Sequence, residues 1–460
     1  MIRRLLVWLD DRSGLVTAVK HALEHPVPPR TGWWYTFGSA TFLAFVLQVV
    51  TGIALATAYV PSSGQAYDSL KFISEQALMG RFLRGLHYFG ASAMVVLIGA
   101  HVARTYIMGA YKFPRELNWL SGALLLLLTM ALAFTGQLLR WDQTAVWSVI
   151  VGAAQAGRMP VLGPQLARFL LAGDTVGGAT LSRFFAFHVF FIPALVFGLV
   201  GLHLLLVLRH GISERPVLGQ PVDKATYRAK YQEMLRREGV PFWPDAAWRD
   251  VVFGAAMVAV VALLALIVGP PELGKPPDPS ILEAYPRPDW YFLWYFALLA
   301  LTPTSWEDAV IVFAPLVFGV ILLLIPIFNT GERSVRRRPW AALVVIFIVV
   351  TIGIFWAAGV RAKWSPDFSA KPLAASLVKN ATPTVVEGAR LFHDKGCEFC
   401  HAIGGQGGER GPDLTEVGTR MNAVGIAGKI TNGGSGMPAF ARTLTPAEVQ
   451  ALTAFLVTRK

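Results

Sequence analysis

The sequence predicts an all-α protein, a polytopic membrane helix bundle of seven transmembrane helices followed by a small soluble α-helical domain. Two observations lead to this expectation. Of the 460 residues, 54% are hydrophobic and only 15% are charged, which excludes an ordinary soluble protein. Seven apolar stretches are long enough, or nearly so, to cross a hydrocarbon core, which takes about 20 residues. Residues 385–460 instead have a polar, glycine-rich composition.

The predicted spans follow these apolar stretches, at 33–58, 86–108, 119–139, 184–208, 250–269, 309–328 and 340–360. Another apolar stretch, 290–301, is too short to cross a membrane, so we expect a re-entrant or interfacial helix there. Residues 1–30 lack the small-residue cleavage site of a signal peptide. We expect them to form an amphipathic segment on the membrane surface.

Basic residues set the expected orientation. The net charge of +12 does not indicate nucleic acid, because Lys and Arg gather in cytoplasmic loops of membrane proteins. They are concentrated in 209–249 and 333–338, whereas the loop between spans five and six has only Lys275 and Arg287. We therefore expect a multi-pass protein of a bacterial cytoplasmic membrane. Its N-terminus is cytoplasmic and its C-terminal domain lies on the outer, periplasmic face.

The only two cysteines belong to a C-x-x-C-H motif, made of Cys397, Cys400 and His401. This motif is typical of a covalent haem, which two thiols attach and the adjacent histidine ligates. The alternatives are a redox dithiol or half of a zinc site, but no second cysteine pair completes a zinc site. The same two cysteines are the only ones available for a disulfide or an iron–sulfur cluster, so neither is expected.

Residues 385–460 resemble small monohaem cytochromes c, and this resemblance implies a sixth iron ligand about 30–60 residues after the motif. Met437 and Met421 qualify by position. We favour Met437, since the glycines before it and the proline after it allow a close, rigid approach to iron. Methionine–histidine ligation raises the potential, so we expect this domain to accept and carry electrons.

Four histidines lie within predicted spans. His87 and His101 are 14 residues apart in the second span, and His188 and His203 are 15 apart in the fourth. These intervals cover about 21–22 Å and return to within roughly 40–60° of the same helix face. Two such helices facing each other form two bis-histidine sites stacked across the bilayer. A lone histidine in a span is often only a buried, hydrogen-bonded group, but matched pairs favour metal ligation.

Four glycines repeat the same interval. Gly38 and Gly52 lie 14 residues apart in the first span, as do Gly122 and Gly136 in the third. A flat macrocycle between four helices needs backbone without side chains where its edges pass, so we expect these glycines to make room for haem. The alternative is ordinary close packing, since glycine is common in transmembrane helices.

Several stretches within residues of about 20–360 resemble cytochrome b of the quinol–cytochrome c oxidoreductases. They are "FLRGLHYFGASAMV", "HVARTYIMGAYKFPRELNWLSG", "TGQLLRWDQTAVW", "TLSRFFAFHVFFIPAL" and "HLLLVLRHGIS". The interval from His188 to His203 resembles the photosynthetic type, which is split into a four-span and a three-span subunit. The resemblance implies two non-covalent haems b, an outer one on His87 and His188 and an inner one on His101 and His203.

The resemblance also divides the chain into five expected parts. Residues 1–30 form the cytoplasmic surface segment, 31–215 the four-helix di-haem core and 216–360 the three-helix part with an outer quinol-site loop. Residues 361–384 form a tether, and 385–460 form the cytochrome c domain.

Five other residues bear on how the haems and the quinol are held. Arg84 and Arg104, near the ends of the second span, are candidates to pair with haem propionates. Thr36 stands where the photosynthetic type attaches an extra haem to cysteine, so no such haem is expected. Arg140 replaces a proline found in many relatives, and Trp141 follows it as a cofactor-binding candidate.

The family's quinol-oxidising signature Pro-Glu-Trp-Tyr appears here as Pro288, Asp289, Trp290 and Tyr291. A carboxylate beside an apolar pocket has a raised pKa and suits proton uptake from a quinol hydroxyl. Asp289 is therefore the candidate base, and its neighbours shape the pocket. The alternative is a simple N-terminal helix charge at a membrane surface. Among relatives the aspartate version accompanies low-potential quinones, so we expect menaquinone.

The resemblance implies that quinol gives one electron to the haems b and the other to a high-potential acceptor. This chain has no iron–sulfur ligands, so we expect a Rieske iron–sulfur partner that passes electrons to the haem on His401. A downstream cytochrome or oxidase then accepts them, proton translocation follows from a Q cycle, and the complex is expected to be a homodimer. An inner quinone site is poorly marked: Arg209, His210 and residues near His21 lie at the right depth, but a solvated basic loop explains them better.

Two other functions remain open at this point. The chain could be a di-haem membrane anchor that exchanges electrons between a dehydrogenase and quinone, or a tethered electron relay without catalysis. The anchor would not need the loop at 270–301 or spans five to seven.

Overall fold

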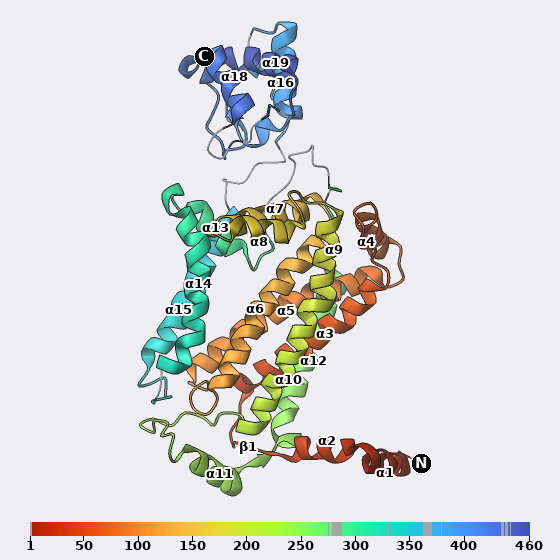
Figure 1. Ribbon diagram of the computed structural model, residues 1–460, viewed down its shortest axis with the longest axis vertical. Helices are drawn as coiled ribbons and strands as arrows, with labels where there is room; N and C mark the ends of the chain where they lie inside the picture. Colours follow the sequence, from red (N-terminus) through yellow and green to blue (C-terminus); the bar gives the residue numbers. More distant parts are fainter. Residues whose placement is uncertain are drawn as a thin grey trace. The chain divides into compact units, whose positions relative to one another are not determined.

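The computed structural model describes residues 2–460 except 275, 278–287, 329–330, 362–369, 379, 434–436, 438–439 and 442, and it describes no side chain for residues 22 and 304. Lys275 and Arg287, which the charge analysis used, lie outside the described residues. The described part is mostly helical and contains almost no sheet (Figure 1).

The elements up to the fourth span are α1 (Ile2–Ser13), α2 (Leu15–Glu24), β1 (Pro26–Val27), η1 (Trp33–Tyr35), α3 (Phe37–Ala56), α4 (Ala66–Glu75), α5 (Gly80–Ile107), α6 (Glu116–Leu138), α7 (Gln143–Gly157), α8 (Gly163–Leu171), α9 (Gly178–Ala186), η2 (Phe187–Phe191) and α10 (Ile192–His210). Next come α11 (Tyr227–Glu238), β2 (Val240–Pro241), η3 (Phe242–Ala246), α12 (Ala247–Ile267), α13 (Leu293–Leu301), α14 (Thr304–Phe328) and α15 (Pro339–Arg361). The C-terminal elements are η4 (Ala375–Leu377), α16 (Pro383–Asp394), η5 (Cys397–Phe399), β3 (Ala402–Ile403), β4 (Gln406–Gly407), α17 (Val417–Arg420), α18 (Ala423–Asn432) and α19 (Pro446–Val457).

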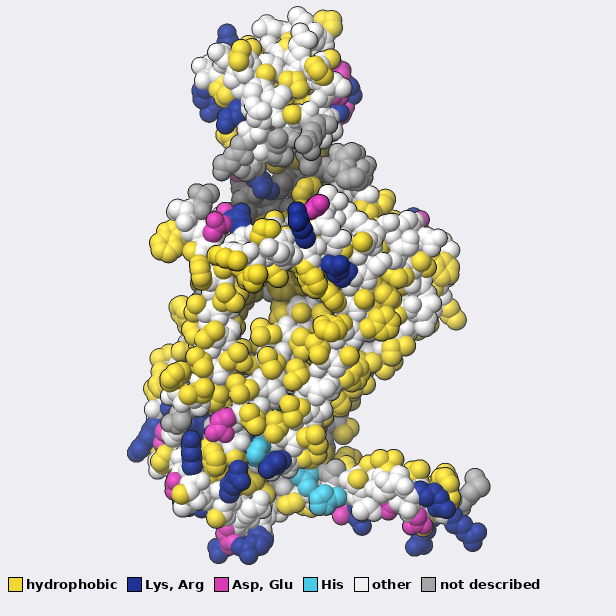
Figure 2. All heavy atoms as spheres, in the orientation of Figure 1, with side chains coloured by type: hydrophobic (Ala, Val, Ile, Leu, Met, Phe, Trp, Pro, Cys, Tyr) yellow, Lys and Arg dark blue, Asp and Glu magenta, His cyan; other side chains and the backbone are white. Residues whose placement is uncertain are grey.

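The predicted fold class is confirmed. Within the described residues, seven helical runs are long and apolar enough to cross a membrane, at Phe37–Ala56, Gly80–Ile107, Glu116–Leu138, Gly178–His210, Phe242–Ile267, Ser305–Phe328 and Pro339–Arg361. Each overlaps one predicted span. The short apolar stretch forms α13, which has nine residues. Figure 2 shows hydrophobic side chains covering the visible faces of the long helices, and Phe191, Leu205 and Ile267 are among the exposed ones. Such surfaces suit lipid rather than water.

The chain divides into two compact units. Unit 1 contains residues 1–140, 172–273 and 309–351, and unit 2 contains 141–171, 274–308 and 352–460. In unit 1, α3 packs on α5, α12 packs on both of these helices, and α10 packs on α6. Small residues permit the close crossings. At Gly85 of α5, for example, a Cβ would lie 2.9 Å from the Cβ of Ala265 in α12.

The two ends of the long helices in unit 1 are named here by the short helices beside them. The α4 end is where α5 begins, since α4 packs on α5. The α11 end is where α10 finishes and α6 begins. At the α11 end β1 pairs with β2 in antiparallel register, Pro26 opposite Pro241 and Val27 opposite Val240. This pairing joins the N-terminal segment to the start of α12.

In unit 2 the C-terminal residues form a small helical domain with its own core. Helices α16 and α19 cross at Gly388, where a Cβ would lie 2.1 Å from the backbone oxygen of Ala451. Phe392, Ile403 and Phe455 are buried beside this crossing. The strands β3 and β4 form a two-residue antiparallel pair.

The final part of the predicted tether packs against this C-terminal domain. Leu373 and Val378 contact its core. The backbone N–H of Ala374 donates to Oε1 of Gln406 at 2.9 Å. The C-terminal domain therefore includes contacts from residues that precede the expected boundary at 385.

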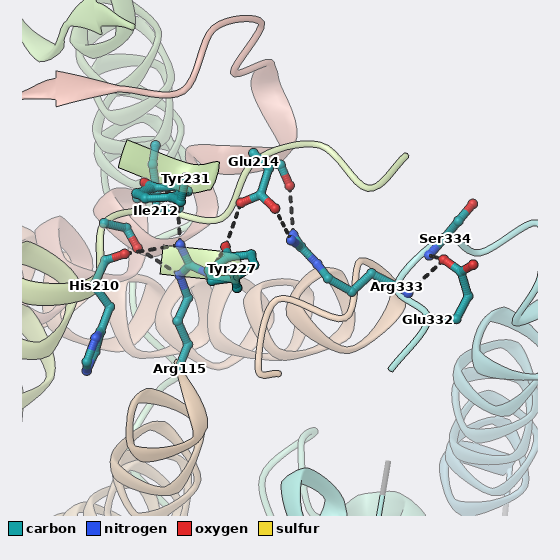
Figure 3. Close-up of polar contacts among 10 residues, drawn as sticks. Arg115, His210, Ile212, Glu214, Tyr227, Tyr231, Glu332, Arg333 and Ser334 are labelled. Carbon is teal, nitrogen blue, oxygen red and sulfur yellow. Dashed lines mark hydrogen bonds and ion pairs between the residues drawn. The ribbon is translucent and has the colours of Figure 1, made fainter. Parts of the chain in front are cut away.

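A buried polar network at the α11 end joins three connecting segments (Figure 3). Arg115, just before α6, donates from Nε to the oxygen of Gly211 at 2.8 Å and from a terminal nitrogen to the hydroxyl of Tyr227 at 2.7 Å. Tyr227 in turn donates to Glu214 at 2.7 Å. Glu214 forms an ion pair with Arg333, which also donates to the backbone oxygen of Glu214 at 2.8 Å.

This ion pair connects the segment after α10 with the segment before α15. The side chain of Arg333 is 5% exposed and that of Glu214 is 25% exposed. Removing one partner of a buried pair leaves the other charge without compensation, which is far more costly than losing a surface pair. The network therefore stabilises the attachment of the last two spans to the first four at this end.

We predict that Glu214→Gln lowers the midpoint temperature of unfolding by several degrees, because it leaves the buried guanidinium of Arg333 uncompensated at a cost on the order of 3 kcal/mol. The matched control is Glu233→Gln, since Glu233 pairs only with the exposed Arg236 and Arg237. This control should shift the midpoint little. Equal shifts for the two variants would contradict the assignment.

The effect of Glu214→Gln should also depend on pH. Burial raises the pKa of Glu214, but the charge of Arg333 and the hydrogen bond from Tyr227 outweigh burial, so the pKa falls below its ordinary value of 4.5. A lowered pKa stabilises the folded state above pH 4.5, and this contribution is lost as pH falls through the folded value. The difference between native and variant protein should therefore shrink in thermal scans taken below pH 4.5.

Candidate functional site

The structure brings His87 and His188 together in unit 1. His87 lies in α5 near the α4 end, and His188 lies in η2, directly before α10. Their ring centres are 6.2 Å apart and the rings are inclined at 79°. Metal–imidazole bonds of about 2 Å, as at zinc, put two rings on opposite sides of one metal roughly 6 Å apart, centre to centre. The spacing therefore fits a single iron between the two imidazoles.

His101 and His203 occupy the other ends of the same helical runs, towards the α11 end. His203 lies in α10, and His101 lies six residues before the end of α5. The two side chains are close enough to interact electrostatically. The four predicted ligands thus form one pair near each end of unit 1.

Each of the four predicted glycines lies against one of the four histidines. A Cβ added at any of them would approach the imidazole carbon Cε1 at or inside ordinary van der Waals distance. The pairs are Gly38 with His101 at 3.1 Å, Gly52 with His87 at 3.3 Å, Gly122 with His203 at 3.4 Å and Gly136 with His188 at 2.6 Å. The glycines thus make room for the imidazole rings, whereas the expectation from the sequence was room for the edge of a macrocycle.

Three of these glycines directly follow a hydroxyl residue that contacts the same histidine. The hydroxyl oxygens lie beside Nδ1, in the pairs Thr51 with His87 at 2.9 Å, Ser121 with His203 at 2.9 Å and Thr135 with His188 at 3.2 Å. The sequence analysis missed these residues. A hydroxyl directly before three of the four glycines was the signal that could have identified them.

The hydroxyl contacts determine which imidazole nitrogen carries the proton. Thr51 donates its own proton to the backbone oxygen of Leu47 at 2.6 Å, and Thr135 donates to that of Ala131 at 2.8 Å. Ser121 does the same with Leu117 at 2.9 Å. Because each hydroxyl has only one proton to donate, it accepts from Nδ1–H of the histidine. The lone pair of Nε2 is then free for a metal.

A π-helical turn explains why His188 and His203 are 15 residues apart rather than 14. His188 lies in η2, the π-helix Phe187–Phe191. A π-turn holds one more residue than an α-turn. The extra residue is absorbed within this turn, so His188 and His203 share a helix face as His87 and His101 do in the regular helix α5.

The two arginines predicted to meet propionates differ in their contacts. Arg84 donates to the hydroxyl of Ser74 at 3.0 Å and to the backbone oxygen of Pro271 at 2.7 Å. The guanidinium of Arg104 lies 3.9 Å from the ring centre of Tyr35. Its Nε and one terminal nitrogen are buried without a hydrogen-bond partner among the described residues. Arg104 therefore keeps donors available for an anionic group such as a propionate.

A further polar pair lies at the α11 end, near His101, and was not predicted from the sequence. Ser39 directly follows Gly38, and its hydroxyl donates to Oδ1 of Asp250 at 2.6 Å. Asp250 belongs to the first turn of α12. An acidic residue at the start of the fifth span was the only sequence signal for this contact.

The predicted quinol signature forms a turn that leads into α13 in unit 2. The hydroxyl of Tyr291 donates to Oδ2 of Asp289 at 3.0 Å. The backbone N–H of Phe292 donates to the oxygen of Asp289 at 2.9 Å. The rings of Trp290 and Tyr291 meet edge to face at 5.6 Å. Asp289 is half-buried, and Pro288 directly precedes it.

Trp141 lies in a second segment of unit 2. It is buried and has a left-handed backbone conformation, with φ of 47°. This conformation turns the chain into α7, whose N-cap is the next residue, Asp142.

In the C-terminal domain the C-x-x-C-H residues occupy the short helix η5 and the residues after it. Cys397 and Cys400 are free thiols. Nδ1 of His401 donates to the backbone oxygen of Pro412 at 2.8 Å. A carbonyl oxygen can only accept, so Nε2 of His401 is left with its lone pair, as at the membrane histidines. At Gly411 a Cβ would lie 2.5 Å from Cε1 of His401, so glycine is again required beside the ligand ring.

The structure leaves the choice of the sixth ligand open. Met437 and Met421 are both partly buried and both pack against the core of the C-terminal domain. Met437 therefore stays a prediction. The donor sets at all three sites nevertheless match the chemistry of haem iron, since each offers imidazole Nε2 beside a clearance that a Cβ would fill.

Three family descriptions match successive parts of the chain. "Cytochrome b/b6/petB" matches residues 22–211, and "Cytochrome b(C-terminal)/b6/petD" matches residues 283–375. "Cytochrome C oxidase, cbb3-type, subunit III" matches residues 383–456. The first description covers the first four membrane helices, the second covers the last two, and the third covers the C-terminal domain.

Individual proteins and one solved structure are similar over long stretches. The menaquinol:cytochrome c reductase cytochrome b subunit of Geobacillus thermodenitrificans is 39% identical over 222 residues, which are 46% of this chain and 99% of that protein. Cytochrome b of Allochromatium vinosum is 31% identical over 369 residues, 76% of this chain and 87% of that protein. A structure titled "Hyperthermophilic respiratory Complex III" shares the fold with a TM-score of 0.67 at 24% identity, covering 86% of this chain and 96% of its own.

The similarity to the Allochromatium protein extends over most of both chains. The chain therefore belongs to the cytochrome b family, with the N-terminal and C-terminal parts of that family fused and a cytochrome c domain at its C-terminus.

Proposed function

We propose that this protein is the cytochrome b and c subunit of a bc-type quinol–cytochrome c oxidoreductase. It oxidises quinol at an outer site, and the two electrons go to different acceptors, a Rieske partner and the two haems b. The observation that carries the proposal is the set of imidazoles held through Nδ1, each against a glycine, at both ends of unit 1.

Within this proposal His87 and His188 hold the outer haem b, and His101 and His203 hold the inner one. Bound haems supply one-electron carriers on the two sides of the membrane. The hydroxyls of Thr51, Thr135 and Ser121 orient three of the four ligands, and Arg104 compensates the charge of a propionate. Cys397, Cys400, His401 and Met437 hold the covalent haem c.

Asp289 acts as the base at the quinol site. Quinol oxidation releases protons, and a carboxylate at a membrane surface can accept one from the substrate hydroxyl. Tyr291 donates a hydrogen bond to Oδ2 of Asp289, which helps to orient the carboxylate. Menaquinol is the proposed substrate, supported by the aspartate in the signature and by the Geobacillus relative, which is named a menaquinol:cytochrome c reductase cytochrome b subunit.

At the α11 end of unit 1, Asp250 and Ser39 form a polar pair next to the glycine that faces His101. Quinone reduction consumes protons, and a hydroxyl–carboxyl pair can deliver them from the cytoplasm. Proton uptake there and release at Asp289 together amount to translocation, the outcome of a Q cycle.

The remaining elements of the proposal concern surroundings and partners. The protein lies in a bacterial cytoplasmic membrane with its N-terminus in the cytoplasm and its cytochrome c domain outside. A Rieske protein delivers electrons to the haem on His401, a downstream cytochrome or oxidase removes them, and the complex is a dimer. The basic loops 209–249 and 333–338 support this orientation.

We predict that Gly136→Ala removes the outer haem b, because the added Cβ would lie 2.6 Å from Cε1 of His188. The pyridine haemochrome ratio of b to c should fall from about two towards about one. The control is Gly198→Ala in α10, where a Cβ meets nothing within 4 Å and the ratio should not change. Full haem content with unchanged low-spin spectra in Gly136→Ala would contradict the proposed ligation.

We predict that Asp289→Asn lowers quinol oxidation about a hundredfold or more, because an amide cannot take up the substrate proton. The spectra of all three haems should be unchanged. Glu272→Gln, an exposed carboxylate earlier in the same loop, is the control and should retain activity. If Asp289→Asn oxidised quinol at the native rate, the protein would act as a relay or an anchor rather than as a quinol oxidase.

We predict that Met437→Leu converts the haem c from low spin to high spin and lowers its potential, because iron loses its thioether ligand. Met421→Leu should leave the spectrum and the potential unchanged. The reverse pattern, measured by absorption spectroscopy and redox titration, would assign the ligand to Met421.

A further inference from the structure

Helix α7 has contacts at both of its ends with the segment that carries Asp289. This segment, residues 274–308, is called the quinol segment here. It lies with α7 in unit 2. Along its length α7 packs mainly on α8. Among the described residues, two polar contacts connect α7 to the quinol segment, one at each end of the helix. Figure 1 labels α7, α8 and α13.

The first contact is a buried carboxylate shared between two backbone donors. Asp142 is 1% exposed. Its Oδ1 accepts from the N–H of Ala145 at 2.8 Å and caps α7. Its Oδ2 accepts from the N–H of Gly274 at 3.2 Å. An N-cap requires only one acceptor oxygen, so the second oxygen serves the quinol segment.

The second contact is an ion-pair cluster at the opposite end of α7. Arg158, the C-cap residue, lies 2.7 Å from Asp308 and 3.3 Å from Glu307. These carboxylates belong to the start of α14, where the quinol segment ends. The cluster is largely exposed, so each pair contributes little stability alone. Its geometry nevertheless fixes where the end of the segment lies relative to α7.

A third contact supports the middle of the segment from another helix. At Gly359 of α15, a Cβ would lie 2.9 Å from the backbone oxygen of Leu293, the first residue of α13. Backbone therefore lies directly against backbone at this point. The contact comes two residues after Tyr291, which holds Asp289.

We propose that α7 is a brace for quinol oxidation, in which Asp142 and Arg158 are positioning residues that set the location of Asp289. This inference rests on the proposed function, since it concerns the same site. A base must lie within hydrogen-bond reach of the proton that it removes, and misplacement by about 1 Å costs on the order of a hundredfold in rate. The brace holds the quinol segment at two fixed points. One is Gly274, before the signature, and the other is Glu307 with Asp308, after it.

The test of the first fixed point is Asp142→Asn in the full complex. An amide has one acceptor oxygen, so either Ala145 or Gly274 loses its acceptor whichever way the side chain turns. Asp142→Ser sharpens the test, because serine still caps a helix but is too short to reach Gly274. Both variants should lower kcat/KM for quinol about tenfold or more, while the haem spectra and potentials stay unchanged.

The matched control is Asp223→Asn. Asp223 also uses both carboxylate oxygens, accepting from the N–H of Ala225 at 3.0 Å and the hydroxyl of Thr226 at 2.8 Å, but it lies in unit 1 beside α11. Its quinol kinetics should equal those of the native protein. A similar loss in Asp223→Asn would mean that the kinetic effect is a general loss of stability and would overturn the proposal.

The second fixed point is tested by exchanging charges. Arg158→Glu places three carboxylates together and should lower kcat/KM, most strongly at low ionic strength. Adding Glu307→Arg and Asp308→Arg to this variant restores opposite charges and should recover most of the native value. A loss that the added changes do not rescue would overturn the role of Arg158.

Hydrogen exchange at the Gly274 amide separates this inference from the proposed function. Exchange should accelerate in Asp142→Asn and Asp142→Ser and stay native in Asp223→Asn. If exchange accelerates but quinol kinetics do not change, the positioning role is overturned while the proposed function stands. If Asp289→Asn also oxidises quinol normally, the proposed function fails as well.

Discussion

The structure depends on one arrangement that recurs at four of its five histidine candidates for metal ligation: an imidazole whose Nδ1 proton is bound by an oxygen and whose ring lies against a glycine. In a membrane interior the oxygen cannot be water, so it comes from a hydroxyl whose own proton is given to its helix. This chain of two hydrogen bonds fixes the tautomer without any charge. The glycine contributes because it has no side chain: a Cβ at Gly136 would lie in the space that the ring of His188 occupies. In the C-terminal domain, Pro412 and Gly411 serve His401 in the same way on an unrelated scaffold.

Some parts of this arrangement could be predicted from the sequence and others could not. Spans and the histidine intervals follow from helix periodicity, so the bundle and its pairing of His87 with His188 were open to prediction. The hydroxyls of Thr51, Ser121 and Thr135 had only a weak sequence signal, their place directly before three of the four glycines, because serine and threonine in a span usually bond their own helix and do so here too. Only the spatial approach of a second helix shows that the same oxygen also serves a ligand. Asp250 was missed for the same reason, since its partner Ser39 lies 211 residues away.

Neither the sequence nor the structure distinguishes Met437 from Met421 as the sixth ligand of the haem c iron, and the reason is different. Both are apolar and both contribute to the core around α16 and α19, so burial does not distinguish a ligand from a packing residue. Signature residues such as Asp289 could be located by motif alone, yet the contacts that hold them could not. The sequence predicts Asp142 as a helix N-cap. That its second carboxylate oxygen accepts from the N–H of Gly274 is seen only in the structure.

The π-helical turn at Phe187–Phe191 has a consequence for the evolution of this helix. Inserting one residue into a regular helix rotates everything beyond it by about 100°, which would turn one of the two ligands on that helix away from its partner. A π-turn confines the insertion to a few residues and leaves the rest of the helix in its former orientation. A single inserted codon can therefore lengthen the interval between the two histidines while both still face the same side of the bundle.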